Sequence, residues 1–231
     1  MDIKGAIFDL DGTLIDTEPI YYGIADKMIK EYGNGKNMDW ETKIKTLGSP
    51  EIVTAKIIVD TYELKLTPEE FIEKRNAITA DLFKKCPFID GGKEITHKFK
   101  HELKLKTALA TSSTKVNFDF KTFNKKEWLK EDFDAIVLGD DKRIKKGKPA
   151  PDIFILAAKE IGLEPKDCII FEDSIGGMKA GIDAGAAIVI GIPAPQLKDK
   201  AKEIKYDEKK TKLILLDCIK DFDFSLIKQD A

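Results

Sequence analysis

The segment Lys4–Leu14 constrains the fold of this chain more than any other, because it carries two acids to the end of a buried strand. Its apolar run at residues 6–8 is typical of a strand buried on both faces of a parallel sheet. Asp9 and Asp11 follow at the carboxyl end of that strand, where open α/β sheets hold their ligands, and Gly12 permits a tight turn. Two carboxylates this close need a cation or a shared proton. The segment therefore predicts a ligand site, with a solvated Asp-Gly turn as the alternative.

A helical pattern replaces the strand pattern from about residue 18 to residue 83, where the sequence offers no strand candidate. Pro19 suits a helix start because its missing N–H has no partner to lose there. Thr67, with Glu70 three residues later, resembles a capping box at the start of a further helix. The segment Pro87–Gly92 then indicates a linker or hinge.

After this linker, apolar strand candidates alternate with amphipathic helices. The expected strands are 107–110, 135–138, 169–171, 187–190 and 213–216, and the expected helices include 93–103, 151–161 and 176–184. Such alternation predicts an α/β fold, a doubly wound, Rossmann-like parallel sheet. We expect a catalytic core made of residues 1–15 and 88–231, with an all-helical cap domain inserted at 16–87. The tail 196–212, rich in Lys, Asp and Glu, is expected at the surface.

Composition limits the classes of partner. The 231 residues include 39 basic and 41 acidic side chains, a net charge of −2, so no global field recruits nucleic acid or an anionic membrane. The three cysteines are widely spaced, without a paired-ligand pattern, and Cys168 is expected to be a buried apolar side chain. No signal peptide or bilayer-spanning run is present, so we expect a cytoplasmic protein that binds a small molecule. The sequence leaves the oligomeric state open.

Further polar groups follow the later strands. The hydroxyls and N–H groups of Thr111 and Ser112 could bind phosphate oxygens, although such clusters more often cap the next helix. Lys148 stands in a stiff Pro- and Gly-containing loop, from which it could reduce the repulsion between two anions; the alternative is an ordinary surface lysine. Glu172 and Asp173 end another strand, unless they merely cap the helix that follows.

With Asp9 and Asp11, the pair Glu172 and Asp173 would gather four acids at neighbouring strand ends. Hard oxygen ligands with room for water suit Mg²⁺, which is the cofactor that the sequence predicts.

His97 and His101 are the only histidines, and their i,i+4 spacing is one that helical zinc sites use. The surrounding lysines and the lack of an intervening glutamate of the zincin type favour a solvated helix face instead.

Asp-Leu-Asp-Gly-Thr-Leu at residues 9–14 resembles the nucleophile motif of the haloacid dehalogenase-like phosphohydrolases, and Thr111, Lys148 and Glu172-Asp173 resemble their later motifs in the same order. The resemblance covers nearly the whole chain. The helical insert is similar to the cap of the subgroup that contains β-phosphoglucomutases and sugar-phosphate phosphatases. Segments 108–113, 136–141 and 147–154 look most like pseudouridine-5′-phosphatase-type enzymes and glycerol-phosphatase relatives.

The resemblance implies a phosphomonoester hydrolase in which Asp9 attacks phosphorus to form an aspartyl-phosphate, while Asp11 protonates the leaving oxygen and then activates water. The metal ligands that it implies are Asp9, the backbone carbonyl of Asp11, Asp173, and Glu172 directly or through water. The phosphate-binding groups that it implies are Thr111, the N–H of Ser112, and Lys148.

Two other functions stay open. A β-phosphoglucomutase-type isomerase uses the same core, but the stretch 18–22 lacks the histidine, and the loop 47–50 lacks the arginine, that such mutases carry. A non-catalytic binding protein on this fold is disfavoured because Asp9 and Asp11 are both present. The substrate itself is not predicted, and Gly48 and Ser49, in a rigid break between cap helices, are the candidate specificity residues.

Overall fold

The computed structural model describes residues 2–46 and 51–227, and its core is a six-stranded parallel sheet. The strands are β1 (Gly5–Phe8), β2 (Lys106–Thr111), β3 (Ala135–Leu138), β4 (Cys168–Glu172), β5 (Ile188–Gly191) and β6 (Lys212–Leu215). Their order is β3-β2-β1-β4-β5-β6, which confirms the predicted doubly wound, Rossmann-like sheet. From β1 the chain adds β2 and β3 on one side, and then crosses back to add β4, β5 and β6 on the other side. The direction of strand addition therefore reverses between β1 and β4, which is the topological switch point of the sheet.

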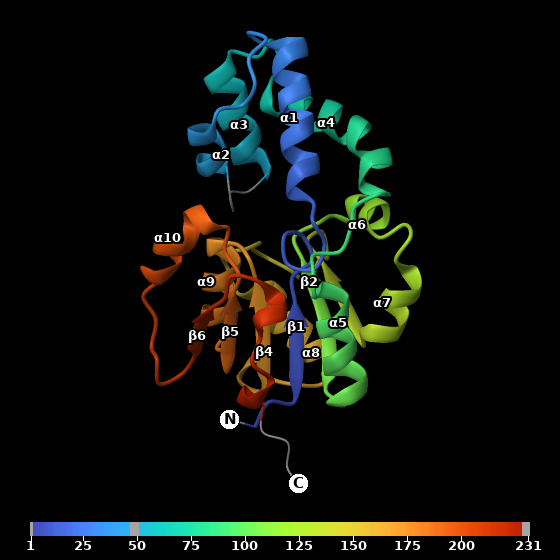
Figure 1. The fold of residues 1–231 in the computed structure, drawn as a ribbon, viewed down its shortest axis with the longest axis vertical. Helices are drawn as coiled ribbons and strands as arrows, with labels where there is room; N and C mark the ends of the chain where they lie inside the picture. Colours follow the sequence, from blue (N-terminus) through green and yellow to red (C-terminus); the bar gives the residue numbers. More distant parts are fainter. Residues whose placement is uncertain (1, 47–50, 228–231) are drawn as a thin grey trace.

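Helices cover both faces of this sheet (Figure 1). One face packs against α5 (Gly92–His97), the π-helical segment η1 (Lys98–Glu102), α6 (Lys115–Lys121) and α7 (Lys126–Asp132); the other packs against α8 (Asp152–Glu160), α9 (Ile175–Asp183) and α10 (Lys198–Lys202). Alternation along β1 explains the two layers, since Phe8 stacks on Phe171 at 4.7 Å on one face while Ile7 belongs to the cluster on the other. Short 3-10 turns lie at Pro165–Asp167, Pro195–Leu197, Ile219–Asp221 and Phe224–Leu226.

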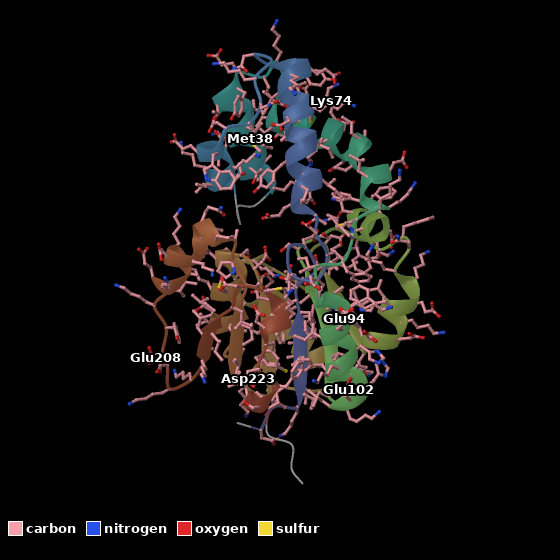
Figure 2. The ribbon with its side chains drawn as sticks, viewed as in Figure 1. Met38, Lys74, Glu94, Glu102, Glu208 and Asp223 are labelled. Atoms are coloured by element: carbon pink, nitrogen blue, oxygen red, sulfur yellow. The ribbon has the colours of Figure 1, made fainter. Side chains whose placement is uncertain are left out.

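Four further helices stand beyond the carboxyl end of the sheet, in the upper part of Figure 1. They are α1 (Glu18–Tyr32), α2 (Trp40–Thr46), α3 (Glu51–Tyr62) and α4 (Pro68–Phe83), and they enclose an apolar cluster of their own. The capping box predicted at Thr67 and Glu70 is present, with both reciprocal hydrogen bonds. Met38, in the loop between α1 and α2, and Lys74, on α4, lie in this group of elements, whereas Glu94 and Glu102 lie beside the sheet (Figure 2).

The two links between these helices and the sheet run side by side. The N–H of Asp16 donates to the carbonyl of Pro87 at 3.0 Å, and the N–H of Ile89 donates to the carbonyl of Leu14 at 2.9 Å. Paired links suit a hinge, and a cap domain spanning 16–87 remains our proposed division of the chain.

Three details differ from the expectations or refine them. The helix expected at 93–103 divides into α5 and the π-helical η1. The segment 196–212 is not wholly surface, because it forms α10 and buries Leu197, Ala201 and Ile204. Gly185 follows the end of α9 with a φ of +80°, a left-handed conformation that glycine adopts readily after a helix. Among the described helices, none has the length and hydropathy to cross a bilayer.

Candidate active site

Three carboxylates meet where β1 and β4 end. Phe8 is in register with Phe171, so the residues that follow them, Asp9 and Glu172, lie side by side, with Asp173 next along the chain. Oxygen atoms of Asp9, Glu172 and Asp173 lie within 4.8 Å of one another. The strand ends therefore bring together three of the four acids that the sequence predicted as one cluster.

Lys148 reaches into this acidic cluster from the loop between β3 and α8. Its Nζ donates to Asp9 Oδ1 at 2.5 Å, to Glu172 Oε1 at 2.6 Å and to the carbonyl of Ala110 at 3.2 Å. Only 8% of the Lys148 side chain is exposed, so it is not the surface lysine of the alternative interpretation. One ammonium group thus faces three carboxylates.

The pKa values of the acids reflect this excess of negative charge. Burial, together with Glu172 and Asp11, raises the pKa of Asp9 to about 7, although Lys148 opposes the shift. Burial and the neighbouring charges of Glu172 and Asp9 raise the pKa of Asp173 well above its usual value. A second cation would relieve both groups, and an all-oxygen set with one lysine fits Mg²⁺.

Two glycines make room for the acids. Gly12 has a φ of +79°, and a Cβ there would lie 2.3 Å from Asp173 Oδ2. A Cβ at Gly177 would lie 1.8 Å from Glu172 Oε1. Glu172 is also held by Ser174, whose N–H and hydroxyl donate to Oε2 at 2.7 and 2.9 Å. Backbone close approach therefore fixes where the carboxylates lie.

The side chain of Asp11 lies outside this acidic cluster and faces the end of β2. Its Oδ2 accepts hydrogen bonds from Thr111 Oγ1 at 3.2 Å and from Ser113 Oγ at 2.8 Å. Its Oδ1 lies 2.5 Å from the Nζ of Lys121. The side chain is therefore separated from the group that could ligate a metal, which leaves its backbone carbonyl as the predicted ligand.

Lys121, at the end of α6, lines the cavity and contacts Asp11, and the sequence interpretation did not single it out. Its side chain is 2% exposed and also donates to Ser113 Oγ at 2.8 Å. Burial works to raise the pKa of Asp11, but the charge and hydrogen bond of Lys121 outweigh it and lower that pKa below its usual value. The sequence carries no clear signal for Lys121, because α6 has only seven residues; the structure shows that Phe118 and Lys121 share its buried face.

Of the two other predicted phosphate-binding residues, one lines the cavity and the other is buried in the protein interior. Ser112 lines the cavity, whereas Thr111 is fully buried and bonds Asp11. Gly48 and Ser49 lie outside the described residues, so their part in specificity stays a prediction.

A cavity of about 480 Å³ lies between the cap helices and the sheet edge. Its floor includes Asp9, Asp11, Lys148 and Asp173, and its roof comes from α1 to α4. Arg75 of α4 also lines the roof, and it is 5% exposed. The arrangement places the carboxyl groups of Asp9 and Asp11 and the ammonium group of Lys148 at the floor of a partly apolar cavity.

Comparison with known proteins agrees with this geometry. The sequence-family model of the haloacid dehalogenase-like hydrolases matches residues 6–190 of this chain. A Saccharomyces cerevisiae protein named as a probable pseudouridine-5′-phosphatase is 37% identical over 202 residues, 84% of each chain.

Two solved structures share the fold. A HAD hydrolase of Entamoeba histolytica superposes with a TM-score of 0.77 at 24% identity, covering 97% of this chain and 96% of that one. A β-phosphoglucomutase of Clostridium difficile superposes with a TM-score of 0.69 at 21% identity, covering 97% and 95%. With a family match over most of its length and the motif residues gathered at one sheet edge, this chain belongs to the haloacid dehalogenase-like hydrolases.

Proposed function

We propose that the protein is a Mg²⁺-dependent phosphatase that hydrolyses a small phosphorylated metabolite through an aspartyl-phosphate on Asp9. The observation that carries the proposal is the pairing of Asp9 with Lys148, next to Glu172 and Asp173, at the floor of the cavity between the cap helices and the sheet edge. The pseudouridine-5′-phosphatase name of the yeast relative supports this substrate class. The cavity volume suits a sugar phosphate or a nucleotide-sized ester.

The chain's own residues can perform both halves of the reaction. An Asp9 oxygen forms a bond to phosphorus while the ester P–O bond breaks. Asp11 gives a proton to the leaving oxygen, a step that requires Asp11 to be protonated when substrate is bound, whereas Lys121 holds the pKa of its carboxyl below the usual value in the substrate-free structure. Asp11, now a carboxylate, takes a proton from water as that water attacks phosphorus and releases Asp9. Lys148 and Ser112 would hold the phosphoryl oxygens, a role supported by their place in the cavity lining with Asp9.

Mg²⁺ would be held by Asp9, Glu172, Asp173 and the carbonyl of Asp11, and its chemistry is to offset phosphate charge. The side-chain part of this set is the cluster of carboxylates described above.

Chelation of divalent metal should stop phosphate release, and Ca²⁺ should restore it poorly because Ca²⁺ prefers more ligands at longer distances. Asp173→Ala should raise the Mg²⁺ concentration for half-maximal activity by about 10-fold or more. Asp183→Ala, an exposed acid on α9, is the matched control and should leave that concentration unchanged. Full activity in chelator would overturn the metal assignment.

A mutase of the β-phosphoglucomutase type remains the second candidate, since one such enzyme shares the fold. A screen of sugar phosphates, nucleotides, pseudouridine 5′-phosphate and glycerol phosphates separates the two. A phosphatase releases inorganic phosphate from its substrate, whereas a mutase returns an isomeric sugar phosphate without net release. Cytoplasmic location and the lack of nucleic-acid partners stay predictions.

Arg75 should help choose the substrate. Its guanidinium is paired with Glu51, donates to Asn76 Oδ1 at 3.0 Å, and lies 5.3 Å from the Tyr21 ring centre. Within the described residues its buried Nε has no hydrogen-bond partner, so a polar group of the substrate could accept from it.

Arg75→Met should raise KM for the preferred natural substrate by about 10-fold, the effect of losing one charged hydrogen bond. An aryl phosphate too small to reach the roof should be affected little. Lys74→Met, the exposed neighbour on α4, is the control. An equal loss for all substrates would show that Arg75 only supports the fold.

A further inference from the structure

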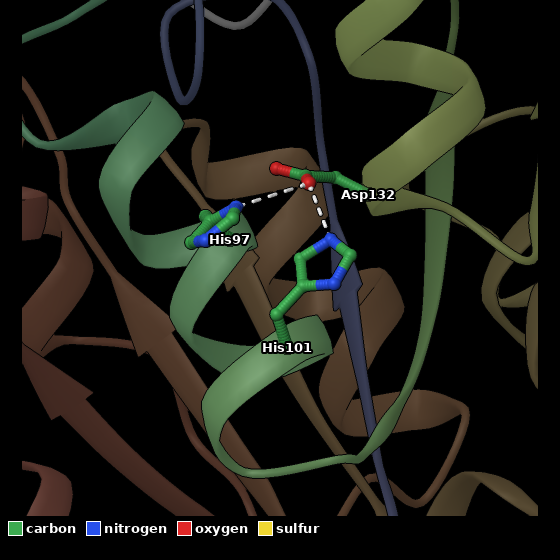
Figure 3. A group of neighbouring side chains, drawn as sticks. All are labelled: His97, His101 and Asp132. Carbon is green, nitrogen blue, oxygen red and sulfur yellow. Dashed lines mark hydrogen bonds and ion pairs between the residues drawn. The ribbon is translucent and has the colours of Figure 1, made fainter.

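His97 and His101 meet a buried carboxylate away from the cavity, although the sequence favoured a solvated helix face. Asp132, the last residue of α7, directs Oδ1 at both rings: His101 Nε2 lies 3.1 Å from it and His97 Nδ1 lies 3.7 Å from it (Figure 3). We propose that these three atoms form a binding site for Zn²⁺ or a similar transition-metal dication, separate from the catalytic magnesium site.

The donor spacing suits such an ion. Zn²⁺ binds His nitrogen and carboxylate oxygen at about 2.0–2.2 Å, so two donors of one tetrahedral ion lie about 3.3 Å apart. The observed separations of 3.1 and 3.7 Å lie on either side of this value. All three donor atoms fall within 4.8 Å of one another. A small adjustment of the two rings, which lie 4.5 Å apart, would complete three positions and leave the fourth to water.

Asp132 is held in place by other groups, as a metal ligand needs to be. The residue is 2% exposed, and its Oδ2 accepts from Thr96 Oγ1 at 2.7 Å. Trp128 Nε1 in turn donates to Thr96 Oγ1 at 2.9 Å. Thr107 Oγ1 donates to the backbone carbonyl of Asp132 at 2.6 Å. These bonds orient the carboxylate so that Oδ1 is the oxygen offered to the imidazoles.

The neighbouring lysines, which argued against a metal from sequence alone, are directed elsewhere. Lys100 Nζ pairs with Asp134 Oδ1 at 2.6 Å, and Lys98 Nζ lies 3.9 Å from the centre of the Phe224 ring. Among the described residues, the ion pairs of Asp132 are with the two histidines and none is with a lysine or arginine. A bound dication would supply a counter-charge to this buried carboxylate.

The donor set also selects the kind of ion. Two imidazole nitrogens and one carboxylate favour Zn²⁺, Ni²⁺ or Cu²⁺ over Mg²⁺ and Ca²⁺, which prefer oxygen. The His97 and His101 side chains are 58% and 37% exposed, so an ion can enter from solvent. A bound ion would join α5 and η1 to the end of α7. These residues do not line the catalytic cavity.

Titration of the untagged full chain with ZnCl₂, in saturating Mg²⁺, tests the proposal. The protein has only two histidines, so imidazole ¹⁵N signals report on this site alone. We expect one Zn²⁺ per chain, shifts of both imidazole signals at Nδ1 of His97 and Nε2 of His101, and a rise of about 5 °C in Tm at saturating Zn²⁺.

The variants His97→Gln, His101→Gln and Asp132→Asn should each weaken this binding by 10-fold or more. Thr96→Val should weaken it by about 10-fold through the orientation of Asp132. Glu102→Gln, an exposed neighbour on η1, is the matched control and should bind Zn²⁺ as the unaltered protein does. Unshifted imidazole signals at saturating Zn²⁺ would overturn the site. Unchanged affinity in Asp132→Asn, with loss in the histidine variants, would overturn the three-ligand set and leave a surface histidine pair.

Discussion

Asp9→Asn should reduce phosphate release by about 10⁴-fold or more, because an amide cannot attack phosphorus and no other described carboxylate occupies its place. The fold should persist, since the substitution is nearly isosteric and removes one charge from a cluster with an excess of negative charge. The measurement is single-turnover and steady-state phosphate release at saturating Mg²⁺. After acid quenching, the unaltered protein should retain phosphate covalently bound to Asp9. The Asp9→Asn variant, quenched in the same way, should carry no bound phosphate.

Asp60→Asn, an exposed acid on α3, is the control and should keep full activity. An Asp9→Asn variant with activity near that of the unaltered protein would refute the aspartyl-phosphate scheme. A stable phosphate label in that variant would point to a different nucleophile.

Lys148→Met should lower kcat/KM by about 10²- to 10³-fold, the loss typical when one preorganised cationic or hydrogen-bonding group is removed from a transition state. Stability should fall as well, because Asp9 and Glu172 lose the cation that bonds both of them. We expect a Tm decrease in metal-free buffer that Mg²⁺ partly reverses, since the ion replaces part of the lost positive charge.

Lys146 is an exposed residue two positions from Lys148 on the same loop. Lys146→Met is the control and should change neither kcat/KM nor Tm. Comparing the two variants thus distinguishes loss of the ammonium group that pairs with Asp9 and Glu172 from a general effect of removing positive charge from the loop. A Lys148→Met protein that turns over normally would show that Lys148 supports only the substrate-free arrangement of the acids.

The fold was readable from the sequence because each strand carries its own local signal. The strand segments Ala6–Phe8 and Ile169–Phe171 are buried on both faces, so every position in them is apolar. An uninterrupted apolar run is easy to recognise in the sequence as a buried strand. The acids after these runs were predicted as neighbours for the same reason, since parallel strands end at one edge. The short helices α2, α6 and α7 were not predicted as separate elements, although α2 lies within the region expected to be helical, because seven residues carry too few turns for a periodic signal.

Contacts between side chains distant in sequence were decided only in three dimensions. Asp11 and Lys121 lie 110 positions apart, and Asp132 approaches His101 across 31 positions, so no local spacing encodes either pair. Lysine-rich composition suggested a solvated face around His97, but the lysines turn to Asp134 and Phe224. The sequence alone determined the strands and the polar residues that end them, because burial and backbone geometry act locally. The tertiary structure decided which charge neutralises which, because that depends on the packing of α6 and α7 against the sheet.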